Sequence, residues 1–141
     1  LFTDAIINDR PIKVFNNGNM MRDFTYIDDI IEGVFRVIFK TATSNKNFKK
    51  SSPNSSNSWA PYRVFNIGNS NPVNLKKYIE TIEKNLGKKA IKELLPMQPG
   101  DVKSTSANTK LLEEWIGFKP NTSIEDGVNK FINWYKIYYE I

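Results

Sequence analysis

The sequence contains no cysteine and no histidine among its 141 residues. The absence of cysteine excludes a disulfide framework and any chemistry that uses a thiol. The absence of histidine removes the commonest general base and a frequent metal ligand. No apolar run approaches the roughly 20 residues that cross a bilayer, so no membrane contact is expected. No metal-ligand spacing is present either, and we predict no metal site.

Several short motifs that hold phosphates or carry out catalysis are also missing. The chain has no Gly-x-Gly-x-x-Gly, no Walker loop and no Tyr-x-x-x-Lys. It begins at Leu1, and the first residues are typical of a helix already under way. We therefore expect a piece of a longer protein, located in the cytoplasm, with no catalytic and no cofactor-binding residue in this piece.

What the chain does contain is the composition of a folded protein with a positive charge. Hydrophobic residues make up 40% and the net charge is +5, which is compatible with an anionic partner. Segment 41–61 is rich in serine, asparagine and lysine and predicts a mobile surface loop. Its lysines, with Phe48 and Trp59, could form a patch that binds single-stranded nucleic acid. We favour a solvated insertion and expect no nucleic-acid partner.

Apolar residues at helical spacing predict four helices after the first few residues. They cover 28–40, 74–87, 109–116 and the stretch from Ser123 onward. Asn74 and Ser123 are favourable N-cap residues, and Gly87 and Gly117 are typical helix ends. Asp28 or Asp29 is expected to cap the helix at 28–40, rather than to form a catalytic carboxylate pair. That helix is apolar around much of its circumference, which predicts packing on more than one side.

Three extended stretches complete an α/β fold. The Asn17-Gly18 pair predicts a tight hairpin over 12–26. The apolar centre of 62–68 predicts an inner strand of a sheet, and 91–96 predicts a short strand. A Pro-Gly turn follows and presents Gln98 and Asp101 on either side.

Arg22 is the candidate anion-binding residue. Its planar guanidinium matches the two oxygens of a phosphate, and it follows the Asn-Gly turn closely. The alternative is a surface ion pair with Asp23 or Asp28, which would contribute little. The alternative for Asp101 is a structural role, in which its side chain stabilises its own turn.

Five runs in the same order and spacing resemble the C-terminal part of an extended short-chain dehydrogenase/reductase. The runs are 11–18, 22–30, 60–69, 95–102 and 131–139. The nearest branch is the UDP-glucuronate 4-epimerases, because galactose epimerases usually carry arginine where Gln98 stands. The resemblance implies a Rossmann domain that binds NAD, outside this chain, and a smaller domain that holds the nucleotide sugar.

The same resemblance implies a division of the chain into three regions. Residues 1–27 form a helix and hairpin of the substrate domain. Residues 28–69 supply a helix, the loop at 41–61 and a strand, which complete the Rossmann domain. Residues 70–141 form the substrate-binding C-terminal region. An isolated chain of this kind would leave an apolar patch exposed.

The function implied by the resemblance is nucleotide-sugar binding within an NAD-dependent UDP-sugar 4-epimerase. Such an enzyme interconverts UDP-glucuronate and UDP-galacturonate through a 4-keto intermediate, and a homodimer is possible. Arg22 would clamp the diphosphate, Val14 and Phe15 would lie along the uridine, and Gln98 and Asp101 would reach the ribose or phosphates. The alternatives are a UDP-sugar dehydratase or decarboxylase of the same superfamily, and a nucleotide-binding piece that is inactive alone.

Overall fold

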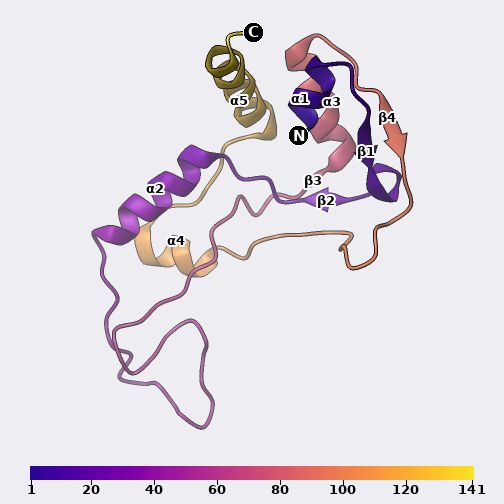
Figure 1. Ribbon diagram of the computed structural model, residues 1–141. Coiled ribbons are helices and arrows are strands. Elements are labelled where there is room, and N and C mark those ends of the chain that lie inside the picture. Colours follow the sequence, from indigo (N-terminus) through magenta and orange to yellow (C-terminus); the bar gives the residue numbers. More distant parts are fainter.

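The computed structural model describes all residues from 1 to 141, as five α-helices, one 3-10 helix and four short strands (Figure 1). In chain order the elements are α1 (Phe2–Ile7), β1 (Ile12–Val14), η1 (Phe15–Gly18), β2 (Met21–Arg22), α2 (Ile27–Ile38), β3 (Val73–Asn74), α3 (Leu75–Leu86), β4 (Lys92–Leu94), α4 (Lys110–Ile116) and α5 (Ile124–Tyr139). The four predicted helices are confirmed to within about two residues at each end.

The core lies where α1, β1, α3 and α5 meet. Its seven buried side chains are all branched aliphatic residues, which pack densely because their rotamers are few. They are Ile6, Ile12, Val14, Ile79, Ile82, Val128 and Ile132. Asn74 caps α3 by accepting a hydrogen bond from the Lys76 amide, and Ser123 caps α5 by accepting one from the Asp126 amide. Both predicted caps are therefore present.

The strands form two separate two-stranded sheets, and the predicted hairpin over 12–26 is wrong. β1 pairs in parallel with β4, with Ile12 opposite Lys92. β2 pairs antiparallel with β3, with Arg22 opposite Val73. Asn16, Asn17 and Gly18 do adopt positive φ angles, but they belong to η1 and turn the chain away from β1. The Asn-Gly signal thus located a turn correctly and its strand partners incorrectly.

α2 lies beside α4, and α5 lies between α2 and the other two core helices, α1 and α3 (Figure 1). Its N-cap is Tyr26, which makes no side-chain capping bond, so the capping role expected of Asp28 or Asp29 is wrong. Asp29 is buried instead, and its carboxylate accepts hydrogen bonds from the Asn121 and Thr122 amides at 3.2 and 2.9 Å. It therefore fixes the segment that leads into α5.

Much of the apolar surface of α2 is exposed, so the predicted packing on more than one side is not present within this chain, whereas the exposed apolar patch implied by the family resemblance is. The exposed residues are Ile27, Ile31, Val34, Phe35, Ile38 and, just past the helix, Phe39. The predicted inner strand at 62–68 also differs from expectation, because this segment has no strand partner in the chain apart from an isolated bridge between Asn57 and Arg63. A strand needs a neighbour to satisfy its backbone groups, and none is supplied here.

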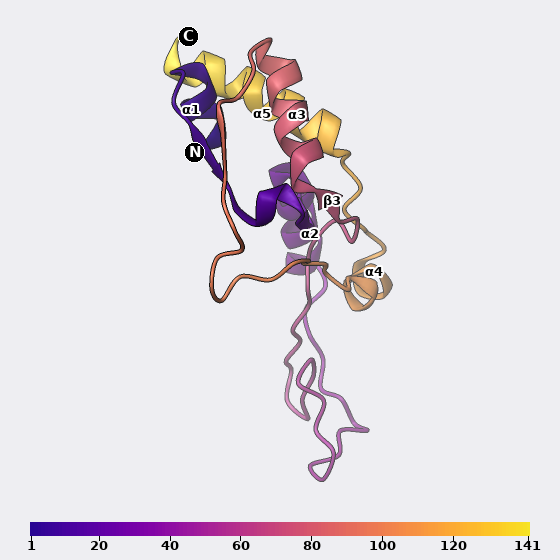
Figure 2. The ribbon, with the colours of Figure 1, turned by 90° about the vertical axis from the view of Figure 1, so that its right-hand side faces the viewer.

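Segment 41–61 forms no helix or strand of its own and projects away from all other elements in both views (Figures 1 and 2). Its base is closed by hydrogen bonds from the Asn45 amide to the Ser58 carbonyl and from the Val64 amide to the Ser56 carbonyl. None of the helices combines the length and the apolar character that crossing a bilayer requires.

A buried carboxylate joins α3 to β4. The Glu83 side chain is only 2% exposed and pairs with Lys92 at 2.7 Å and Lys89 at 3.2 Å, while the Ala90 amide donates to it at 3.0 Å. Burial by itself raises the pKa of Glu83, but the bonds from Lys92, Ala90 and Lys89 outweigh it and lower the pKa to about 2. Glu83 thereby holds the approach to β4 against α3.

Candidate anion and nucleotide site

The candidate site is built where η1, β2 and the segment after β4 come together. The parallel pairing of β1 and β4 continues past the strands, because the Leu95 amide donates to the Val14 carbonyl and the Asn17 amide donates to the Leu95 carbonyl. Gly18 is buried, has φ +77° and lies so close to Lys76 that a Cβ there would stand 2.8 Å from its Cγ. The turn in η1 thus has little room for a larger residue.

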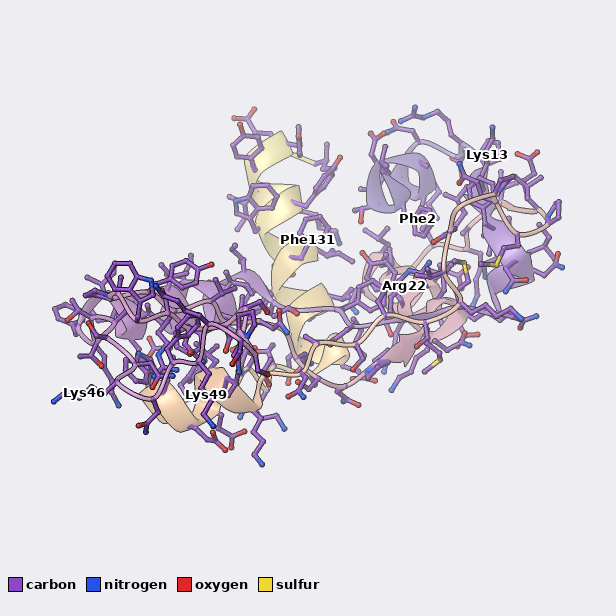
Figure 3. The ribbon with its side chains drawn as sticks, turned by 90° about the horizontal axis from the view of Figure 1, so that it is seen from below. Phe2, Lys13, Arg22, Lys46, Lys49 and Phe131 are labelled. Atoms are coloured by element: carbon purple, nitrogen blue, oxygen red, sulfur yellow. The ribbon has the colours of Figure 1, made fainter.

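Arg22 lies at the end of β2 and is 23% exposed, so it is neither buried nor free in solvent. Figure 3 shows it near the middle of the molecule, far from the loop that carries Lys46 and Lys49. One terminal nitrogen, Nη2, donates to the Asp101 carboxylate at 2.8 Å, and Nη1 donates to the Met21 carbonyl at 2.9 Å. Its Nε–H has no hydrogen-bond partner, which leaves a donor for a ligand.

Asp101 stands at the end of the predicted Pro-Gly turn, which the structure confirms. The Asp101 amide donates to the Gln98 carbonyl at 3.2 Å, and Gly100 has φ +82°, as a turn with glycine at its third position requires. The Asp101 carboxylate also accepts from the Val102 amide at 2.7 Å. Asp101 therefore stabilises its own turn and faces Arg22 at the same time.

The five predicted site residues do not all have the same environment. Arg22 and Asp101 are in direct contact, and Gln98 is exposed on the turn beside them with no side-chain hydrogen bond. Phe15 is half-buried at the start of η1. The Val14 side chain is buried in the core. Contact between Val14 and a uridine stays a prediction, and the Val14 side chain itself packs in the core.

The segment from 101 to 105 is attached to β2 by backbone bonds that the sequence did not indicate. The Met21 amide donates to the Lys103 carbonyl at 2.9 Å, and the Thr105 amide donates to the Met21 carbonyl at 3.2 Å. These bonds bring Asp101 alongside Arg22 although the two are distant in the chain. Backbone donors and acceptors occur at every residue, so no sequence pattern marks this pairing.

The chemistry available here is anion binding. A partly exposed guanidinium binds phosphate through charge-assisted hydrogen bonds, and Gln98 adds a neutral amide that can both donate and accept. No group of acidic side chains in the structure could hold a metal ion. The site has no nucleophile paired with a base, so it is equipped to bind and orient a ligand.

Comparison with known proteins identifies the family of the chain. The family model described as GDP-mannose 4,6 dehydratase matches residues 3–131. Protein CapI of Staphylococcus aureus is 52% identical over 139 residues, which are 99% of this chain and 42% of that protein. A probable UDP-glucuronate 4-epimerase of Rhizobium meliloti (strain 1021) is 44% identical over 135 residues, covering 95% of this chain and 40% of that protein.

A solved structure of an epimerase also matches the chain. The UDP-glucuronic acid 4-epimerase of Bacillus cereus, in complex with UDP-glucuronic acid and NAD, superposes with a TM-score of 0.74 at 28% identity. The match covers 98% of this chain and 39% of that one. The chain thus spans about two fifths of the proteins it matches. It belongs to the GDP-mannose 4,6 dehydratase-like family of NAD-dependent extended short-chain dehydrogenases/reductases.

Proposed function

We propose that this chain is the nucleotide-sugar-binding part of a UDP-sugar 4-epimerase that interconverts UDP-glucuronate and UDP-galacturonate. The observation that carries the proposal is the contact between Arg22 and Asp101, which places a partly exposed cation beside the turn bearing Gln98. Relatives described as UDP-glucuronate 4-epimerases match over almost the whole chain. A diphosphate is the natural ligand of such a cation.

In this proposal the chain holds the nucleotide while the sugar turns. Binding energy from the nucleotide, which does not react, can support the reacting end without restricting its rotation. NAD supplies the hydride chemistry when bound, but the chain has no Gly-rich loop that fits its pyrophosphate. We therefore place the NAD loop and the catalytic groups elsewhere in the enzyme, and give this chain the role of positioning the substrate.

The proposal also covers domain organisation. It rests on two features, the exposed apolar face of α2 and the unpaired segment 62–68. An apolar helix face of this size is unusual at a free surface, and a segment of extended backbone lacks a sheet neighbour. We propose that both pack on the Rossmann domain of the complete enzyme, with 1–27 and 70–141 forming the substrate domain. A homodimer of the complete enzyme is part of the same proposal.

A dehydratase is the second candidate, because the matching family model is described by that activity. The test incubates the full-length enzyme and NAD with UDP-glucuronate, and separately with GDP-mannose, and analyses the products by chromatography and mass. A product of unchanged mass that co-elutes with UDP-galacturonate supports the epimerase. Loss of one water from GDP-mannose, whose C6 carries a hydroxyl, supports the dehydratase. No turnover of UDP-glucuronate contradicts the proposed function.

A further inference from the structure

The carboxylate of Asp23, the residue next to Arg22, receives three backbone hydrogen bonds from two distant segments. Its Oδ2 accepts from the Ala107 amide at 2.8 Å and from the Ser70 amide at 3.1 Å, and its Oδ1 accepts from the Asn71 amide at 3.4 Å. Asp23 makes no ion pair with Arg22 or any other cation in the structure. Its charge is met entirely by backbone N–H groups.

The Asp23 backbone takes part in the same arrangement. Its amide donates to the Thr105 hydroxyl at 3.3 Å, next to the backbone bonds that join Met21 to 103 and 105. Space around the carboxylate is restricted, since a Cβ at Gly68 would stand 2.6 Å from the Ala107 Cβ and 3.3 Å from Asp23 Oδ2. Asp23 therefore fixes 68–71 and 105–107 against the end of β2.

These contacts lie on the chain segments that adjoin the candidate site. The segment fixed at 105 and 107 is the continuation of the turn that carries Asp101, and the chain fixed at 23 is the continuation of the strand that carries Arg22. The bonds made by Asp23 therefore help to set the separation between Arg22 and Asp101, because they hold the chain that follows each of these two residues. An ionised carboxylate is the one side chain here that can accept from three amides without offering a donor.

We propose that Asp23 is a positioning residue for nucleotide-sugar binding, which holds the segments of Arg22 and Asp101 in register and does not itself touch the ligand. This inference rests on the proposed function. A shift of the Arg22 segment would weaken the charge-assisted hydrogen bonds that its guanidinium makes to a diphosphate, because such bonds depend steeply on distance and angle. Asp23→Asn replaces one acceptor oxygen by an N–H donor that faces backbone N–H groups, so it disturbs this register with almost no change in volume.

The test measures UDP binding by calorimetry on the full-length enzyme in four forms: the parent, Asp23→Asn, Arg22→Ala and the double variant. Asp28→Asn is the matched control, because Asp28 is an exposed aspartate nearby with no hydrogen bond or ion pair. We expect Asp23→Asn to weaken UDP binding about ten- to hundredfold, the size of a lost hydrogen bond to a charged group, and Asp28→Asn to leave it unchanged. In the Arg22→Ala background, Asp23→Asn should cause a clearly smaller loss, since part of its effect acts through Arg22 and only the part that acts through the Asp101 turn remains.

Each other result is informative. Equal losses from Asp23→Asn with and without Arg22 would show a general structural role and overturn the inference, as would no loss at all. If Asp23→Asn does not fold, Thr105→Val removes one bond of the set and should show a smaller loss with the same dependence on Arg22. Failure of both variants to fold would also overturn the positioning role. Absence of UDP binding in the parent enzyme would contradict the proposed function itself.

Discussion

Arg22 and Asp101 lie 79 residues apart in the sequence and are joined by an ion pair of 2.8 Å. The two side chains are 23% and 33% exposed, and an ion pair with that much solvent access contributes little to stability. Its value is geometric, because it orients the guanidinium and holds the turn at 98–101 next to it. A bound diphosphate would meet a cation whose direction is already set.

The first prediction concerns Arg22 directly. In the full-length enzyme, Arg22→Ala should weaken UDP-sugar binding by about 1.5–3 kcal/mol, the usual size of hydrogen bonds to a charged group. Arg22→Lys should recover part of the loss, because it keeps the charge but not the planar fork. Arg10→Ala serves as the control, since Arg10 is an exposed arginine paired with Asp4 away from the site. Calorimetry with UDP-glucuronate that shows no loss for Arg22→Ala would remove this residue from the binding site.

The second prediction concerns pH and Glu83. Because its pKa falls from 4.5 unfolded to about 2 folded, its contribution to stability is complete above pH 4.5 and is lost as the pH falls toward 2. At neutral pH the contribution is about 3–4 kcal/mol, since the pKa falls from 4.5 to about 2 and each pKa unit is worth ~1.4 kcal/mol. Urea unfolding of the parent and Glu83→Gln should show a difference that shrinks steadily between pH 4.5 and 2. A difference that is constant with pH would contradict the assignment.

The third prediction concerns the left-handed turn in η1. Gly18→Ala should destabilise the protein by about 1–2 kcal/mol through its φ of +77°, with a further cost from the contact with Lys76. Gly87→Ala is the matched control, because Gly87 has φ +68° but nothing within 4 Å of an added Cβ. Denaturant unfolding should therefore show a larger loss at Gly18 than at Gly87. Equal losses would mean that Lys76 moves away without cost.

The fourth prediction concerns the apolar face of α2. If this face packs on the Rossmann domain, Ile31→Ser should destabilise the full-length enzyme by about 2–4 kcal/mol, as truncation of a buried aliphatic residue does. Ile137→Ser near the end of α5 is the control, because Ile137 is 79% exposed and the proposal leaves it at the surface. A change at Ile31 within about 0.5 kcal/mol, typical of surface positions, would indicate that α2 is free in the enzyme.

The helices were predictable because their signals are local. Asn74, Ser123, Gly87 and Gly117 act at the ends of their own helices, and the apolar spacing between them needs no knowledge of distant residues. The predicted short strand at 91–96 is also present, as β4, but the pairing of the strands was not predictable in the same way. Ile12 pairs with Lys92, and no short-range pattern identifies a partner that far along the chain.

In the candidate site, too, contacts between residues far apart in the chain could not be predicted from the sequence. Arg22, Gln98 and Asp101 were found because they stand in recognisable runs with charged or turn-forming residues. The roles of Asp23, Asp29 and Glu83 were missed, since their main partners are backbone amides or lysines that only the tertiary structure brings near. Asp29 looked like a helix cap because aspartate at a helix start usually is one. Here tertiary contacts with 121–122 replaced that local role.

The closed base of the 41–61 loop has a practical use. Because Asn45, Ser56 and Ser58 close the base, the residues between 46 and 55 can be shortened or replaced without opening it. This outlying tip is far from Arg22 in Figure 3, which makes it a suitable attachment point for a fluorophore or an affinity tag. A label there would report on the enzyme while leaving the candidate anion site untouched.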